Sequence, residues 1–132
     1  MSQENVEVMR QVFATWEDDD LEGFLAYMDE ELVTCRHPPM PDPGTWYGRA
    51  GALDLVAEWL QSFDDFTVSA EEYIDARDHV VVRTLQGGRG TSGGVPVTGT
   101  VWAVCGLRSG RMVTWDIYGA RAQALEAAGL AE

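Results

Sequence analysis

Among the side chains of this sequence that can transfer protons in organic reactions, three are placed as candidates: His37, Asp116 and Tyr118. An imidazole titrates near pH ~6.5, so His37 can take up or release a proton at neutral pH. It precedes a proline-rich loop, and loops at a pocket mouth often carry function. Asp116 and Tyr118 would supply a carboxylate acid/base and a hydroxyl that stabilises an oxyanion. We take these three as candidate catalytic residues.

The predicted strand over residues 111–118 leaves open which way Asp116 points. Side chains alternate between the two faces of a strand. One face combines Met112, Thr114, Asp116 and Tyr118, and the other carries Val113, Trp115 and Ile117. If the mixed face lines a pocket, Asp116 is an acid/base or ligand-binding group. If the apolar face points inward, Asp116 lies on the outer or dimer surface, and periodicity alone favours this second arrangement.

Arg83 lies in an otherwise apolar stretch, Val80-Val81-Val82-Arg83-Thr84. A buried guanidinium requires an anionic partner. That partner is either an Asp or Glu of the chain, which makes a structural ion pair, or the carboxylate or enolate of a ligand. Arg83 is therefore also a candidate for oxyanion stabilisation.

Large aromatic side chains are numerous for so short a chain. A pocket for planar, apolar compounds uses these residue types with only a few polar groups, although core and dimer packing use them equally. Trp46 and Tyr47, which follow the loop over residues 38–44, are candidates for a lid. The candidate ligand-binding residues are Trp16, Tyr27, Met40, Trp46, Tyr47, Trp59, Arg83 and Trp102.

Two features argue against a metal or cofactor. No Asp, Glu or His cluster shows metal-ligand spacing. Cys35 and Cys105 are expected to be buried small hydrophobic residues. The position of Cys35 beside Arg36 and His37 is the only hint of a thiolate. The segment 88–93 (GRGTSG) matches a dinucleotide fingerprint, which functions only where it opens a helix. A strand-like stretch follows instead, so we expect a hairpin loop or bulge and no bound nucleotide.

Composition narrows the classes of partner. The chain has 132 residues, 22 acidic against 9 basic, a net charge of −13, and no lysine. Phosphate backbones and anionic membranes are bound by clustered basic residues, so we expect neither nucleic acid nor membrane as a partner. The first residues lack the features of a signal peptide, and no apolar run approaches the ~20 residues of a membrane helix. We expect a cytoplasmic protein with one domain over residues 1–132.

The elements that must position these residues follow from hydrophobic periodicity. Helical spacing predicts helices over residues 6–16 and 21–28, the second capped by Asp20, and a largely buried helix over 50–63. Strands are predicted over 32–37, 66–74, 79–86, 95–107 and 111–118, and a short helix over 121–128. Short turns between the last four strands predict an antiparallel meander in an α+β fold.

This order of elements resembles the nuclear-transport-factor-two-like superfamily, specifically its SnoaL-like branch. The likeness is carried by the paired N-terminal helices with Asp20-Leu21-Glu22-Gly23-Phe24, by residues 46–52 (WYGRAGA), by 107–111 (LRSGR), and by the tail from Tyr118 through AQALEAAGL (122–130). The resemblance implies a cone-shaped fold, a curved antiparallel sheet packed against three N-terminal helices with a short C-terminal helix. It also implies a pocket for a small hydrophobic molecule and a homodimer.

Catalytic residues of the superfamily transfer poorly to this chain. The resemblance places Val12 where ketosteroid isomerases have a tyrosine, and Arg36 or His37 where they have the aspartate base. Arg83 and Asp116 match two members of the acid–arginine–acid group of epoxide hydrolases, and Asp116 is the nearest match to the acid of polyketide cyclases. The chain is thus either a cofactor-independent acid/base enzyme (cyclase, isomerase or hydrolase) acting on a hydrophobic metabolite, or a non-catalytic ligand-binding or accessory dimeric domain. A third interpretation is a purely dimer-forming domain in which the protein's own side chains fill the pocket.

Overall fold

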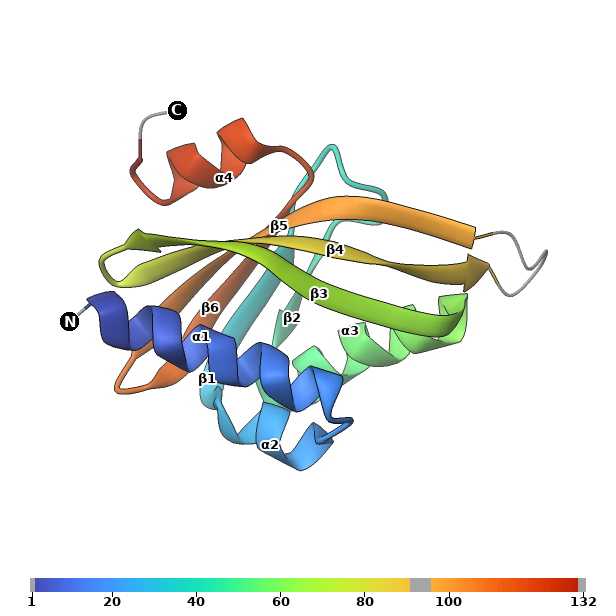
Figure 1. Cartoon of the computed structure of the whole chain (residues 1–132), viewed down its shortest axis with the longest axis horizontal. Coiled ribbons are helices and arrows are strands. Elements are labelled where there is room, and N and C mark those ends of the chain that lie inside the picture. The colour runs from blue at the N-terminus through green and yellow to red at the C-terminus, as the bar shows by residue number, and fades with distance from the viewer. Residues whose placement is uncertain (1, 91–95, 131–132) are drawn as a thin grey trace.

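The computed structural model describes residues 2–90 and 96–130. Within these residues, four helices pack against one six-stranded sheet (Figure 1). The elements in chain order are α1 (Ser2–Glu17), α2 (Leu21–Ala26), β1 (Met28–Arg36), β2 (Gly44–Tyr47), α3 (Gly48–Ser62), β3 (Phe63–Ala76), β4 (His79–Gly90), β5 (Pro96–Arg108), β6 (Arg111–Tyr118) and α4 (Arg121–Ala127). No helix in this described part of the chain is long and apolar enough to cross a bilayer.

The acidic run after α1 forms a turn that reverses the chain. Asp19 has a φ of 53°, a left-handed conformation that ends the helix. The Asp20 carboxylate then accepts a 2.9 Å hydrogen bond from the Gly23 N–H, which confirms it as the N-cap of α2. This turn places Phe24 of α2 edge-on against Trp16 of α1, with ring centroids 5.7 Å apart.

Strands β3 to β6 form the predicted antiparallel meander. The strand order across the sheet is β2-β1-β6-β5-β4-β3, so β1 lies beside β6 although they are far apart in the chain. These two strands run parallel, with Cys35 opposite Asp116. The predicted α+β fold of a curved sheet, three N-terminal helices and a short C-terminal helix is confirmed, with the refinement that one strand pair makes the sheet mixed.

The elements around β1 differ from the sequence prediction. α2 ends at Ala26 rather than at residue 28, β1 begins at Met28 rather than at residue 32, and β2 was not predicted at all. β2 is a four-residue edge strand that pairs only with β1, from Val33 opposite Tyr47 to Arg36 opposite Gly44. Prolines are tolerated next to edge strands, and this is why a short strand can form directly after the proline-rich loop.

Strand alternation divides the apolar residues between two cores on opposite faces of the sheet. Val80 and Val82 of β4 and Cys105 of β5 pack toward α1, α2 and α3, on the face that we call the inner face. Val81 and Val104 point the other way and pack under α4, on the outer face. Figure 1 shows α1, α2 and α3 on one side of the sheet and α4 on the other. Each strand residue therefore points either to the three-helix layer or to the outer face, part of which α4 covers.

Arg36 joins three elements at the end of β1. Its side chain is only 7% exposed and forms an ion pair with Glu58 of α3 through Nη1 and Oε2, which are 2.8 Å apart. Its Nε donates a 2.7 Å hydrogen bond to the Asp42 carbonyl oxygen, and its guanidinium carbon lies 5.1 Å from the centre of the Trp46 ring. Arg36 thus fixes the proline-rich loop and α3 against the sheet.

The glycine-rich segment has a structural role in the sheet. Gly88 and Gly90 lie in β4, a Cβ at Gly88 would stand 2.6 Å from the Asp64 carbonyl oxygen of β3, and β5 follows from Pro96. Glycine is required there because the two backbones approach too closely for a side chain. A strand and no helix comes next, as predicted, while residues 91–95 lie outside the described residues.

We predict that Glu58→Gln lowers the free energy of unfolding by roughly 1–3 kcal/mol, because the buried Arg36 guanidinium loses its carboxylate partner. Urea unfolding followed by circular dichroism measures this. Glu30→Gln is the matched control: its carboxylate lies 3.8 Å from Arg49 and is 82% exposed, so its loss should change stability by less than about 0.5 kcal/mol. Equal effects of the two substitutions would contradict the role given to Arg36.

Candidate functional site

The inner face of the sheet and the helix layer enclose an apolar cavity of about 40 Å³. Its walls come from α1, α2, α3 and four strands. The lining residues are Met9, Val12, Phe13, Trp16, Phe24, Met28, Trp59, Val68, Cys105, Met112 and Trp115. Among these described residues Cys105 is the only titratable one, and burial raises the pKa of its thiol well above the ordinary value, so it stays neutral. Nothing in this lining can move a proton near neutral pH.

Two further cavities adjoin the first. One of about 160 Å³ opens between α1, α2 and α3, shares Trp16 and Phe24 with the first, and has Leu21 and Leu60 at its rim. These two leucines are 49% and 55% exposed. The other, of about 40 Å³, shares Phe13, Trp59, Val68 and Trp115 with the first and adds two polar side chains, Thr84 and Gln86. The second and third cavities thus each share lining side chains with the first, and the three form one series.

Aromatic rings form the partitions of this series. Trp16 and Phe66 meet edge-on at 6.1 Å between centroids, and Trp59 stacks on Phe66 at 5.8 Å. Trp59 also meets Trp115 edge-on at 5.8 Å. Trp16 and Phe24 line both the first and the second cavity, and Trp59 lines both the first and the third, so a change of rotamer at one of these residues would connect neighbouring cavities.

The candidate catalytic residues lie on the opposite face. Asp116 is opposite Val104 of β5, which packs under α4, whereas Ile117 is opposite Ala103 of the inner core. Residues paired directly across a sheet point to the same side. The apolar residues Trp115 and Ile117 therefore face inward and Asp116 faces outward, which is the second of the two arrangements left open by the sequence.

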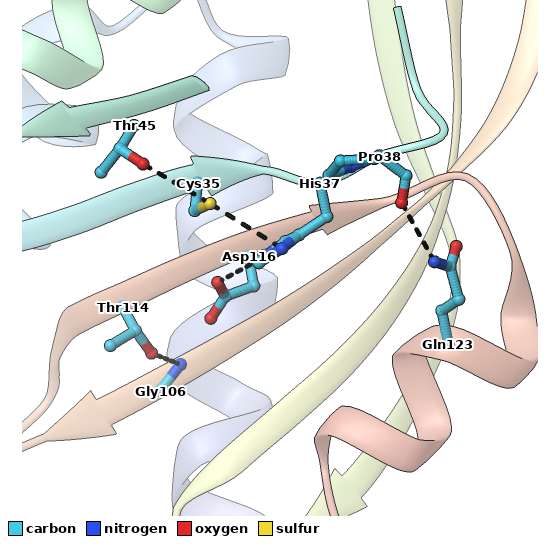
Figure 2. Close-up of polar contacts among 8 residues, drawn as sticks. All are labelled: Cys35, His37, Pro38, Thr45, Gly106, Thr114, Asp116 and Gln123. Atoms are coloured by element: carbon cyan, nitrogen blue, oxygen red, sulfur yellow. Dashed lines mark hydrogen bonds and ion pairs between the residues drawn. The ribbon is translucent and has the colours of Figure 1, made fainter. Parts of the chain in front are cut away.

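His37 and Asp116 form a hydrogen-bonded pair on this outer face (Figure 2). Nε2 of His37 lies 2.8 Å from Oδ1 of Asp116, and both side chains are 30% exposed. The His37 ring stacks on Tyr118, with centroids 4.4 Å apart and an interplanar angle of 4°. On the other side, Nδ1 of His37 lies 3.8 Å from Sγ of Cys35. Figure 2 shows the imidazole between the thiol and the carboxylate.

The local backbone explains why these residues meet. Cys35 and His37 are two residues apart at the end of β1, so extended chain places both on one face. The His37 N–H donates a 2.9 Å hydrogen bond to the Ile117 carbonyl oxygen, which prolongs the parallel β1–β6 pairing by one residue. We call Cys35, His37, Asp116 and Tyr118 the outer cluster.

Burial raises the pKa of the Tyr118 hydroxyl, and the nearby Asp116 carboxylate and Cys35 add to the shift. The neutral phenol is therefore favoured in the folded protein. Tyr118 can donate a hydrogen bond to a developing oxyanion at neutral pH, as its candidate role requires, and it does so without competing as a base.

Arg83 does not join the outer cluster. It faces outward on β4, where its Nε lies 3.3 Å from Oε1 of Glu72, so the structure contains the structural ion pair that the sequence allowed. The same carboxylate oxygen lies 3.5 Å from Nη1 of Arg121 in α4. Arg83 is opposite Trp102, and Trp102 is opposite Tyr118, so two strand spacings, about 10 Å, separate the Arg83 and Tyr118 backbones.

The candidate ligand-binding residues are scattered. Trp16 and Trp59 line the cavities, but Trp102 lies under α4 with the Arg121 guanidinium 5.2 Å from its ring centre. Trp46 packs against Arg36, and Tyr47 is 71% exposed on β2. Tyr27 packs at the edge of the inner core, and Met40 lies against Gly119. Of the candidates named here, only Trp16 and Trp59 therefore line one of the three cavities described above.

Sequence reasoning missed several residues that the structure makes prominent. Phe13, Phe66 and Trp115 complete the cavity walls, and a wider reading of every inward aromatic would have found them. Cys35 is half-buried within the outer cluster and not the buried small hydrophobic residue that the sequence predicts. Its position beside His37, the one hint of a thiolate in the sequence, is the signal for this contact.

The sequence matches one family model, that of the SnoaL-like domain, over residues 9–115, which is well over half of the chain. The chain belongs to the SnoaL-like domain family. This confirms the resemblance to the SnoaL-like branch, and the matched residues include the residue 46–52 segment, while the tail from Tyr118 lies beyond them. No curated protein matches the chain in sequence.

Solved structures share the fold at low sequence identity. An NTF2-like protein of unknown function from Burkholderia pseudomallei is 18% identical, with a TM-score of 0.77 over 93% of this chain and 95% of that one. TerC, co-crystallised with polyporic acid, is 21% identical, with a TM-score of 0.77 over 96% and 98%. A protein from Catenulispora acidiphila with a ketosteroid isomerase-like fold, in complex with trimethylamine, is 17% identical, with a TM-score of 0.74 over 95% and 94%. The SnoaL-like domain of the present protein thus has an NTF2-like fold.

We predict that Tyr118→Phe reduces the loss of stability at alkaline pH. The raised pKa means that the unfolded tyrosine ionises first, near pH ~10, so ionisation favours unfolding as pH rises through that value. Phenylalanine keeps the stacking surface and removes this proton-linked contribution. Urea midpoints between about pH 9 and 11 measure the slope. The same slope in Tyr118→Phe and the parent protein would contradict the burial of this hydroxyl.

Proposed function

We propose that this SnoaL-like protein binds a small, largely apolar ring compound in the cavities between its helices and the inner face of its sheet, without transforming it. The observation that carries the proposal is the separation of the two features. The first cavity is lined by apolar side chains, Asp19 and Asp20 lie only in the lining of the open second cavity, and the candidate catalytic side chains lie behind the sheet. A ligand in the cavities is therefore out of reach of His37, Asp116 and Tyr118.

The cavity volumes limit the size of the ligand. An apolar cavity of about 150 Å³ accommodates one benzene ring. The open cavity measures about 160 Å³, and rotation of Trp16 or Phe24, which line both this cavity and the first one, would connect the two. We infer a compound with one or two fused rings, which enters past the exposed Leu21 and Leu60.

Polar groups at the far end would orient the ligand. Thr84 already donates a 2.7 Å hydrogen bond to the Val101 carbonyl oxygen, whereas the Gln86 amide offers two N–H donors and a carbonyl acceptor at the end of the third cavity. A ligand with one hydroxyl or keto group on an apolar ring system fits this distribution. Two proteins of the same fold that were crystallised with small molecules, polyporic acid and trimethylamine, support a binding role.

We predict that Val12→Phe lowers the affinity for 2-naphthol at least tenfold. Val12 is 3% exposed and lines the first cavity, so the larger ring fills space that the ligand requires. Isothermal titration calorimetry measures the affinity, and thermal unfolding checks that the variant is folded. Val33→Phe is the matched control, because Val33 lies on β1 with 36% exposure and points to the opposite face.

Three results would contradict the proposal: no heat of binding in the parent protein for any apolar one- or two-ring probe, equal losses in Val12→Phe and Val33→Phe, or loss of binding in His37→Gln. A loss of affinity in Gln86→Leu that is smaller than in Val12→Phe, and that affects only probes with a hydroxyl group, would support the proposed orientation. If Gln86→Leu leaves the ratio of the affinities for naphthalene and 2-naphthol unchanged, the proposed orientation is wrong.

A second candidate function rests on one observation, the 2.8 Å hydrogen bond between His37 and Asp116 beside the Tyr118 ring. On the outer face this pair would abstract a proton next to a carbonyl group, and Tyr118 would stabilise the enolate. Exchange of the α-protons of 2-tetralone in D2O, followed by NMR, tests this. The candidate predicts a loss of roughly 100-fold or more in Asp116→Asn, and exchange no faster than in buffer would exclude it for this substrate class.

A further inference from the structure

The outer cluster brings together three types of side chain that bind transition metals. Cys35, His37 and Asp116 each offer one donor atom, and these atoms all lie within 4.8 Å of one another. Sulfur, imidazole nitrogen and carboxylate oxygen are the donors found in zinc sites. We propose that Cys35 and His37 bind a borderline-soft divalent metal ion such as Zn²⁺, with Asp116 as the residue that positions His37. This goes beyond the ligand-binding function proposed above, which uses the other face of the sheet.

The His37–Asp116 pair sets the imidazole for this role. A carboxylate only accepts hydrogen bonds, so the 2.8 Å contact requires the proton on Nε2. In the neutral imidazole Nδ1 then carries the free lone pair. That atom faces Sγ of Cys35. Metal-binding histidines in proteins typically donate their second ring N–H to a carboxylate in this way, which fixes the ring and increases its basicity.

The distance between the two donor atoms fits one shared ion. Zn–S and Zn–N bonds of about 2.3 and 2.0 Å at a tetrahedral angle place the two donors about 3.5 Å apart. The observed separation of Sγ and Nδ1 is 3.8 Å, so an ion can bridge them with little movement of either side chain. The backbone spacing of two residues on an extended strand produces this separation directly.

The surroundings favour a metal-bound thiolate. The Thr45 hydroxyl lies 3.7 Å from Sγ of Cys35 and donates toward it. The side chains of His37 and Asp116 are 30% exposed, so an ion can enter from solvent and water can occupy the remaining coordination positions. The net charge of −13 further raises the local concentration of cations.

The experiment titrates Co²⁺ into the full-length, reduced, chelator-treated protein and follows the thiolate-to-cobalt charge-transfer absorption. We expect this band to appear, to be abolished in Cys35→Ser, and to disappear from the parent protein when Zn²⁺ displaces Co²⁺. His37→Gln should weaken Co²⁺ binding at least tenfold and Asp116→Asn by 10–100-fold. His79→Gln and Cys105→Ala are the matched controls, since they are the other histidine and cysteine of the chain, and each should leave the band and affinity unchanged.

A measurement on the unmodified protein covers the case in which a variant does not fold. Zn²⁺ should slow the alkylation of Cys35 by iodoacetamide at least tenfold, with peptide mass mapping used to separate Cys35 from Cys105. The proposal is overturned if the parent protein shows no charge-transfer band, if the band persists in Cys35→Ser, or if Zn²⁺ leaves the alkylation rate unchanged. Binding of Co²⁺ without the band would indicate adventitious sites on the acidic surface and would also overturn it.

Discussion

Alternation of side chains along the strands is the constraint on which the rest of this structure depends. In β4, β5 and β6 each residue faces either the layer of α1, α2 and α3 or the side covered by α4. The apolar residues that face the three helices create an apolar interior, and the same alternation sends Asp116 and Tyr118 outward. A shift of one residue in the β5–β6 register would exchange the two sets, so the register decides which chemistry meets the cavities.

This separation gives the two faces different physical characters. The interior is held by edge-on and stacked aromatic contacts around small cavities. The outer face of β1 and β6 presents an ordered set of polar groups linked by the His37–Asp116 hydrogen bond. Arg36 links the two faces, because its side chain contacts both the loop that follows His37 and α3, which forms one wall of the cavities.

Much of the fold could be predicted from sequence because its cues are local. Helical periodicity, the Asp20 cap and the turns between β3 and β6 depend on residues close together in the chain. The parallel pairing of β1 with β6 and the edge strand β2 could not be predicted, because periodicity within a segment does not identify its distant neighbour. The meeting of Cys35 and His37 with Asp116 depends on that pairing. For the same reason, Trp16 and Trp59 could be proposed as pocket residues, while Trp102 could not be assigned to the opposite face before the register was known.

The central claim is that a ligand occupies the apolar interior and not the outer face. The most direct test is to measure intermolecular nuclear Overhauser effects between a bound two-ring probe and the methyl groups of the protein. The account predicts contacts to the methyls of Met9, Val12 and Met28, which line the cavity. Contacts to the His37 and Tyr118 rings, with none to those methyls, would contradict it and place the ligand at the outer cluster.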